Sequence, residues 1–275
     1  MNFSKRHALG NDFLIQLVAP SDQGYSPKVA GQLCDRRRGI GADGLIVGTV
    51  DPHSPDTASM VLYNSDGSRA EMSGNGIRCL AHAVFDSYFR PLGASEQIFS
   101  ISTDAGPKKV YLRTGGDLTE IYASVDMGPI GSVVQDQKGI WVDMGNPHLV
   151  VFCEEADHPV PHEVAMLGKE MQNVRPGGIN IEWISASDAV GATFRMSVYE
   201  RGVGPTLACG TVSCASFLAA RHLGLVQDKA TIVNPGGPLD LEVSKGRLIL
   251  GGPSRLICDF SSAYPFGLVS VGEQA

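Results

Sequence analysis

The stretch SGNGIRC at residues 73–79 has a counterpart in ACGTVSC at residues 208–214. In each stretch a small polar residue, Ser73 or Cys209, precedes a glycine and the start of an apolar segment. At the same spacing Tyr63-Asn64 aligns with Tyr199-Glu200, and within one residue of it GNDFLI aligns with GNPHLV. These matches indicate an internal duplication, with two related halves that each present one short site. Two such groups on opposite sides of a carbon could move a proton from one face to the other.

Composition favours a soluble globular protein and argues against several partners. The chain has 275 residues, 43% of them hydrophobic, and a net charge of −7. An acidic chain without a basic face is a poor candidate for nucleic-acid binding. The N-terminus MNFSKRHALGNDF lacks the apolar run of a signal peptide, and no segment is long enough to span a membrane. We therefore expect a cytoplasmic protein whose six cysteines are reduced and show no metal-ligand spacing.

Hydrophobic periodicity and turn residues predict alternating strands and helices in both halves. Helices are expected at 27–38, 77–89, 161–172 and 211–223. Strands are expected at 13–18, 45–50, 60–63, 98–103, 108–114, 119–127, 139–144, 148–153, 180–185, 192–199, 229–233, 239–243 and 247–251. The triplet at 36–38, Arg-Arg-Arg, would end the first helix, where cations favour the carbonyl end of the helix dipole. The pattern is mixed, with hairpin-like connections, and lacks a GxGxxG nucleotide fingerprint.

The two glycine-containing turns have the chemistry of carboxylate sites. The first N–H groups of a helix point at whatever lies over its N-terminus, and the helix dipole adds positive potential. Gly74, Gly76 and Gly210 allow close backbone approach. A cysteine in this field is expected to have a lowered pKa, so that its thiolate could act as a base. Donors aimed at the carboxylate of an amino acid could stabilise the carbanion left by loss of its α-hydrogen.

His148 and Glu200 are the ionisable residues expected to tune such a base, since they lie near equivalent strand ends. Taken singly, a cysteine before glycine is more often part of a core or turn, and a histidine after proline is more often structural. The recurrence of these features at one offset in both halves favours the functional interpretation.

Six segments together resemble the diaminopimelate epimerase family, whose members are cofactor-independent two-base amino-acid epimerases of lysine and peptidoglycan-precursor biosynthesis. They are FSKRHALGNDFLI, CDRRRGIGADGL, YNSDGSRAEMSGNGIRC, MGNPHLVVF, NIEW and YERGVGPTLACGT, in order along nearly the whole chain. The resemblance implies that Cys209 is one of two catalytic cysteines, with Ser73 at the position of the other, and that His148 and Glu200 assist. It also implies substrate contacts by Asn11, Asn64, Asn146, Asn180, Glu200 and Arg201, and clamps on the reacting carboxylate by Gly74-Asn75 and Gly210-Thr211.

The family resemblance also implies the fold and the partners. The expected fold is α/β of the α+β type, with two pseudo-symmetric domains from a duplication and the active site in the cleft between them. Each domain is a mixed, largely antiparallel sheet wrapped around a central helix. The expected domains are 1–116 with 263–275, and 117–262. The family uses neither pyridoxal phosphate nor a metal, and a homodimer is expected, although Cys258 stands where some members have a dimer-contact tyrosine.

Ser73 is the main departure from the family pattern, because an alkoxide is far harder to form than a thiolate. Pro205 and Val212 also replace a usual glutamate and glycine around Cys209. Three functions stay open: an epimerase with unequal groups, a one-base amino-acid dehydratase or other racemase, and a binding protein without turnover. A serine here fits a natural enzyme or one altered to trap substrate. The retained His148 and Glu200 favour an epimerase that inverts LL- and meso-diaminopimelate.

Overall fold

The computed structural model describes residues 1–21, 25–187 and 192–262, and the chain divides into two compact units. The first unit comprises Met1–Val125 and the segment that begins at Gly252, and the second comprises Asp126–Gly251. The boundaries between the units fall within two strands, β8 (Glu120–Pro129) and β17 (Arg247–Ser261), whereas the predicted domain boundaries lie just outside these strands. The predicted segment 263–275 lies outside the described residues.

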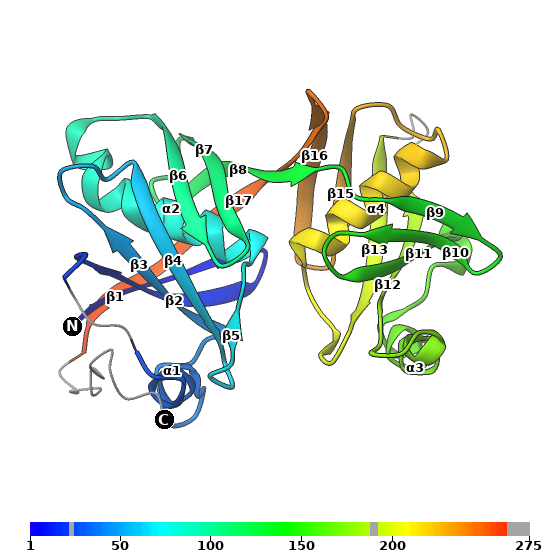
Figure 1. Ribbon diagram of the computed structural model, residues 1–275, viewed down its shortest axis with the longest axis horizontal. Helices are drawn as coiled ribbons and strands as arrows, with labels where there is room; N and C mark the ends of the chain where they lie inside the picture. Colours follow the sequence, from blue (N-terminus) through cyan, green and yellow to red (C-terminus); the bar gives the residue numbers. More distant parts are fainter. Residues whose placement is uncertain (22–24, 188–191, 263–275) are drawn as a thin grey trace. The chain divides into compact units, whose positions relative to one another are not determined.

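The first unit contains two α-helices within a mixed sheet (Figure 1). Its elements are β1 (Asn2–Ala8), β2 (Asn11–Val18), α1 (Pro27–Cys34), β3 (Gly44–Val50), β4 (Thr57–Asn64), β5 (Arg69–Ala70), α2 (Gly74–Tyr88), η1 (Arg90–Leu92), β6 (Glu96–Thr103), β7 (Gly106–Thr114) and the start of β8 (Glu120–Pro129). β2 pairs in parallel with β3, and β4 pairs in parallel with β6. The β1–β2, β3–β4, β6–β7 and β7–β8 pairs are antiparallel.

The second unit repeats this order of elements. They are the end of β8, β9 (Val133–Asp136), β10 (Gly139–Asp143), β11 (Pro147–Phe152), η2 (Glu155–Asp157), α3 (Pro161–Met171), η3 (Gln172–Val174), β12 (Asn180–Ala186), β13 (Thr193–Glu200), β14 (Gly204–Pro205), α4 (Gly210–His222), β15 (Lys229–Asn234), β16 (Gly237–Ser244) and the start of β17 (Arg247–Ser261). Here β11 pairs in parallel with β12, and β13 with β15, while β12–β13 and β15–β16 are antiparallel. The matching pairings confirm two pseudo-symmetric units with mixed, largely antiparallel sheets.

Each unit buries one helix against its own strands. The residues of α2 from Gly74 to Phe85 are all buried, and α2 packs on β1 and β2. α4 is buried over most of its length and packs on β10 and β11. Figure 1 shows both helices, α2 in cyan and α4 in yellow, lying along the strands of their units. A buried Phe such as Phe85 or Phe217 contributes roughly 1.5–3 kcal/mol by leaving water.

The first helix is shorter than the sequence predicts. α1 begins at Pro27 with Ser26 as its N-cap, as expected, but ends at Cys34 rather than at residue 38. The side chain of Asp35 accepts the backbone N–H groups of Arg37 and Arg38 at 2.7 and 2.9 Å. This local turn competes with helical hydrogen bonding and ends the helix early. The prediction that the arginine triplet ends a helix is therefore wrong.

The two site helices begin slightly earlier than predicted, at Gly74 and Gly210, so Ser73 and Cys209 are their N-caps. Within the described part of the chain, no helix is both long and apolar enough to cross a membrane.

Candidate active site

Ser73 and Cys209 begin their helices with nearly the same backbone geometry. Ser73 has φ −135° and ψ 125°, and Cys209 has φ −138° and ψ 130°. Both are extended N-cap residues, so their side chains lie beside the N–H groups of a first helical turn. Each unit therefore places one proton-carrying side chain at a site that favours an anion.

The two N-caps differ in their hydrogen bonds. Oγ of Ser73 accepts the N–H of Gly76 at 3.0 Å, whereas Cys209 makes no capping hydrogen bond. Sγ of Cys209 lies 3.4 Å from Oγ1 of Thr211. A serine hydroxyl that accepts through its oxygen can still donate its proton. The geometry thus suits Ser73 as a proton donor better than as a base.

The environment of Cys209 is opposite to the expectation of a lowered pKa. Burial, and after it the negative charge of Glu200, raises the pKa of the Cys209 thiol to about 12. The hydrogen bond with Thr211 acts in the other direction but is outweighed. Desolvation, which disfavours the charged thiolate, is the largest of these effects. Cys209 is therefore a protonated thiol near neutral pH, and the prediction of a lowered pKa is wrong.

Asn11 and Asn75 come together in the first unit. Nδ2 of Asn75 donates to Oδ1 of Asn11 at 3.3 Å, and Nδ2 of Asn11 donates to Oδ2 of Asp43 at 2.9 Å. Asn75 is 2% exposed, and its Oδ1 accepts from the buried Arg78 at 2.8 Å. Asn64 is exposed, and its side chain instead donates to Ser68 in the turn that follows β4.

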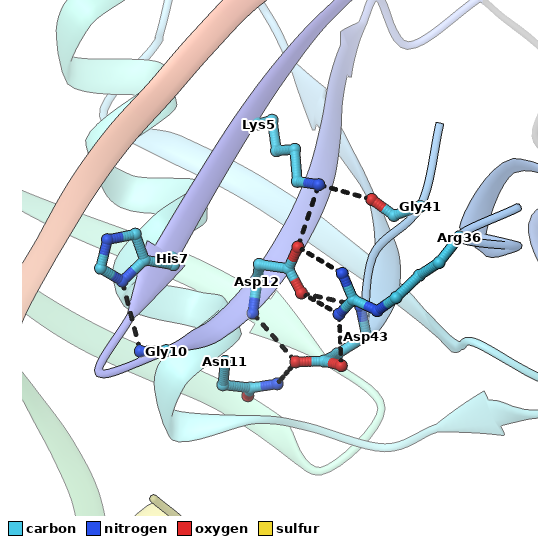
Figure 2. A network of polar contacts seen from close by, with 8 residues as sticks. All are labelled: Lys5, His7, Gly10, Asn11, Asp12, Arg36, Gly41 and Asp43. Atoms are coloured by element: carbon cyan, nitrogen blue, oxygen red, sulfur yellow. Dashed lines mark hydrogen bonds and ion pairs between the residues drawn. The ribbon is translucent and has the colours of Figure 1, made fainter. Parts of the chain in front are cut away.

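Beside Asn11 lies a cluster of two acids and two bases, which we call the Asp12 cluster: Lys5, Asp12, Arg36 and Asp43 (Figure 2). Arg36 binds Asp12 at 2.6 Å and Asp43 at 2.8 Å, and Lys5 binds Asp12 at 3.1 Å. Burial raises the pKa of Asp12, but hydrogen bonds from Arg36 and Lys5 outweigh it and hold the pKa below its usual value. The cluster is charge-neutral and holds the start of β2, where Asn11 lies.

A buried acid–imidazole pair lies in the second unit. Nδ1 of His148 is 2.5 Å from Oε1 of Glu182, and both side chains are fully buried. Nε2 of His148 is 3.0 Å from Oδ1 of Asn146. Burial raises the pKa of Glu182, although His148 opposes this rise. Both ring nitrogens of His148 thus lie within hydrogen-bond distance of an oxygen atom.

The remaining residues of the second unit gather at strand ends. His148 and Asn180 are register partners at the starts of β11 and β12. Oδ1 of Asn180 accepts the backbone N–H of Arg201 at 2.9 Å, which ties β12 to the end of β13. Glu200 ends β13 and accepts a hydrogen bond from the hydroxyl of Thr206. The side chain of Arg201 lies in an exposed turn.

Apart from Asn64, the predicted residues thus lie in one region of each unit. Ser73, Gly74, Asn75 and Asn11 gather at the start of α2. Asn146, His148, Asn180, Glu200, Arg201, Cys209, Gly210 and Thr211 lie at strand ends and at the start of α4.

Sequence reasoning missed the partners of these residues: Asp43, Arg78, Glu182 and Thr206. A signal existed for two of them, since Arg78 and Glu182 are charged residues inside otherwise apolar segments. Among the described residues, no group of three or more His, Cys, Asp or Glu side chains could hold a metal ion.

Comparison with solved structures supports the fold. A predicted epimerase from Pseudomonas aeruginosa matches with a TM-score of 0.69 at 12% identity, over 96% of this chain and 99% of that one. A probable proline racemase from Agrobacterium radiobacter K84 matches with a TM-score of 0.65 at 13% identity, over 96% and 94%. At such low identity these matches establish the architecture and not the reaction.

Sequence comparison establishes the family. The family model described as diaminopimelate epimerase matches residues 3–133 and 140–254. The diaminopimelate epimerase of Clostridium perfringens is 33% identical over 94% of this chain and 98% of that protein. The diaminopimelate epimerase of Synechocystis sp. is 36% identical over 94% and 97%. With the two matched helix N-termini described above, these similarities show that the chain belongs to the diaminopimelate epimerase family.

Proposed function

We propose that this chain interconverts LL- and meso-2,6-diaminopimelate, with Cys209 and Ser73 as its two proton-transfer groups. The observation that carries the proposal is the matched pair of N-caps, each beside the first turn of a buried helix. Inversion at an α-carbon needs one group to remove the proton and a second group to deliver one to the opposite face. The duplication supplies two such groups from equivalent positions.

The helix N-termini provide the electrostatic part of the reaction. The N–H groups of Gly74-Asn75 and Gly210-Thr211 are suited to hold the carboxylate next to the reacting carbon. As the α-proton leaves, charge develops on this carboxylate, and preorganised donors stabilise it without further rearrangement. This stabilisation lets the reaction proceed without pyridoxal phosphate.

Cys209 acts as the base on its side, with Glu200 as its partner. The raised pKa means that the thiol must lose its proton before it can accept one from carbon. Glu200 is the neighbouring carboxylate whose charge acts on the thiol, and it is positioned to take this proton. A substrate ammonium group near the thiol would favour the thiolate, since an opposite charge lowers the pKa of an acid.

Ser73 acts as the donor on the other side. Its oxygen accepts from Gly76, and its hydroxyl proton remains available for donation to the substrate. After donation Ser73 is an alkoxide and Glu200 holds a proton, so proton exchange with water returns both groups to their starting states. An alkoxide has no comparable stabilisation, so inversion through Ser73 is slow in both directions. His148, held by Glu182 and Asn146, assists proton transfer.

The second amino-acid head of the substrate is assigned to polar residues outside the two N-caps. Asn64, Asn146, Asn180 and Arg201 supply amide and guanidinium groups that suit a carboxylate and an ammonium group. We further propose that the enzyme works in the cytoplasm as a homodimer, as the family resemblance implies. Light scattering during size-exclusion chromatography tests the dimer directly.

Isotope exchange tests the reaction. The protein is incubated with LL-diaminopimelate in D2O, and both α-deuterium and meso product are measured. Deuterium uptake with meso product is expected, and Cys209→Ala should abolish both. Exchange without inversion would indicate a one-sided catalyst, and release of ammonia would indicate a lyase. Binding without exchange would contradict the proposal. Activity that survives treatment with hydroxylamine would support chemistry without pyridoxal phosphate.

A further inference from the structure

Four side chains at the start of α2 and β2 form one directed chain of hydrogen bonds. Arg78 donates to Asn75, Asn75 donates to Asn11, and Asn11 donates to Asp43. The donor–acceptor distances are 2.8, 3.3 and 2.9 Å. The two central members, Asn11 and Asn75, are positions at which the family resemblance implies contact with the substrate.

The charged ends of this chain determine how both amides face. A carboxamide can be turned by 180°, which exchanges its oxygen and its NH2 group. A carboxylate such as Asp43 only accepts hydrogen bonds, and a guanidinium such as Arg78 only donates them. Turning Asn11 would set its oxygen against the Asp43 carboxylate and its NH2 against that of Asn75. Two hydrogen bonds would then be lost, so a single orientation is favoured.

Asp43 is itself held by a donor on each of its oxygens. Oδ1 accepts from Arg36 at 2.8 Å, while Oδ2 accepts from Asn11 and from the backbone N–H of Asp12 at 3.1 Å (Figure 2). The side chains of Asp43 and Arg36 are 44% and 55% exposed, so their ion pair adds little to stability. The role of Arg36 is to keep an oxygen atom of the residue 43 side chain turned toward its guanidinium group.

We propose that Asp43 is a positioning residue, which fixes the amide of Asn11, and through it that of Asn75, in the orientation that binds substrate. The inference rests on the proposed function, with Asn11 and Asn75 as the substrate contacts that the family resemblance implies. Asp43 touches no reacting atom and acts only through Asn11. Its loss should therefore weaken substrate binding far more than it slows the chemical step.

Asp43→Asn is the direct test, because Arg36 dictates how the new amide turns. The amide introduced at position 43 should face Arg36 with its oxygen, which leaves its NH2 against the NH2 of Asn11. We expect KM for LL-diaminopimelate to rise about tenfold, which is the effect of losing one hydrogen bond and leaving its partner unsatisfied. The kcat should change less than threefold. Removing Arg36 as well, in Arg36→Met/Asp43→Asn, should restore KM to within threefold, since the introduced amide can then turn its oxygen to Asn11.

Two matched variants separate positioning from a general structural effect. Lys5→Met removes a charge from the Asp12 cluster without touching Asp43, so KM should change less than twofold. In an Asn11→Ala background, Asp43→Asn should have no further effect on KM. An unchanged KM in Asp43→Asn, an equal loss in the Asn11→Ala background, or no rescue by Arg36→Met would each overturn the proposal.

Failure of the proposed function gives a different result. A wild-type chain that neither exchanges nor inverts diaminopimelate contradicts that function. The same variants are then compared by calorimetric binding of meso-diaminopimelate. A tenfold weaker Kd in Asp43→Asn, rescued by Arg36→Met, would support the positioning role without turnover. Absence of binding by the wild-type chain would overturn both proposals.

Discussion

Glu182 and His148 share a 2.5 Å hydrogen bond between fully buried side chains. The other nitrogen of His148 meets the oxygen of Asn146, and Oε2 of Glu182 has no hydrogen-bond partner. A buried polar atom without a hydrogen-bond partner lowers the stability of the fold, so burying Oε2 of Glu182 is less favourable than burying an apolar side chain of the same size. The cost is consistent with a role in proton transfer.

Glu182→Gln should distinguish the role of Glu182 in proton transfer from its role in stabilising the fold. Glutamine retains a hydrogen bond to Nδ1 but cannot exchange a proton with it. We expect kcat to fall at least tenfold, while the free energy of unfolding changes by no more than about 1 kcal/mol. Glu182→Leu instead leaves Nδ1 of His148 buried without a partner, and should destabilise the fold by about 1–3 kcal/mol. Initial rates and urea unfolding measure both; equal stability losses in the two variants would contradict the prediction.

Ser73 should contribute to folding as well as to chemistry. Its hydroxyl caps α2 through Gly76, and loss of such a cap costs about 1 kcal/mol. Ser73→Ala should therefore lower the free energy of unfolding by this amount and abolish inversion. Ser73→Cys should raise the inversion rate strongly, because a thiol ionises more readily, but should recover only part of the lost stability, since sulfur is a weak acceptor. An unchanged inversion rate in Ser73→Cys would contradict the role of residue 73.

Cys209→Ser is the reciprocal change in the second unit. Cys209 makes no capping hydrogen bond, although its backbone matches that of Ser73. A serine there could cap α4, so stability should increase by up to about 1 kcal/mol. Deuterium exchange should stop, because the base is lost. Thermal unfolding and deuterium exchange in D2O together test whether Cys209→Ser gains stability while it loses activity. A loss of stability in this variant would show that the two N-caps are not equivalent.

The sequence predicted the duplication and the two N-termini because both depend on local patterns. The sequence did not predict β1, because the buried Arg6 interrupts the alternation of apolar and polar residues along this strand. The charge of Arg6 is paired by Asp86 at 2.8 Å, and this partner lies far away in the sequence. β17 continues past a Gly-Gly-Pro turn signal because it pairs with β16 through residues 247–251 and with β1 beyond residue 254. Such partners lie far apart in sequence, so local periodicity cannot supply them.

The reactivity of Cys209 depends in the same way on distant groups. Burial first, and then the charge of Glu200, raises the pKa of the thiol to about 12, against the effect of the helix N-terminus. Alkylation by iodoacetamide should thus be slow at pH 7.5 and should rise steadily up to pH 10. Glu200→Gln removes the negative charge, lowers the pKa and should speed alkylation severalfold. The exposed Cys258 is an internal reference for reagent activity, measured by mass spectrometry of the same samples. A slower reaction in Glu200→Gln would contradict this account.

Stability should fall in mild acid because of His82. This side chain is fully buried on α2, and it contacts Asp86 and Ser254, with Arg6 and Arg90 bound to the same carboxylate. Burial lowers the pKa of His82 to about 4, despite the hydrogen bond with Asp86. Between pH 6.5 and 4, His82 is therefore protonated in the unfolded chain but mostly neutral in the folded chain. Stability is complete above pH 6.5 and decreases as the pH falls toward 4.

At pH 5 the loss from His82 is on the order of 2 kcal/mol. His82→Gln cannot take up this proton, so its urea-unfolding free energy should differ less between pH 7 and pH 5 than that of the wild type. Some pH dependence should persist, because burial also lowers the pKa of His158 in the second unit to about 4. His158→Gln is the matched control, and combining the two changes should remove most of the dependence. If the unfolding free energy of His82→Gln differed between pH 7 and pH 5 as much as that of the wild type, His82 would not be the titrating group. The loss of stability in acid comes only from groups that bind more protons in the unfolded chain than in the folded chain.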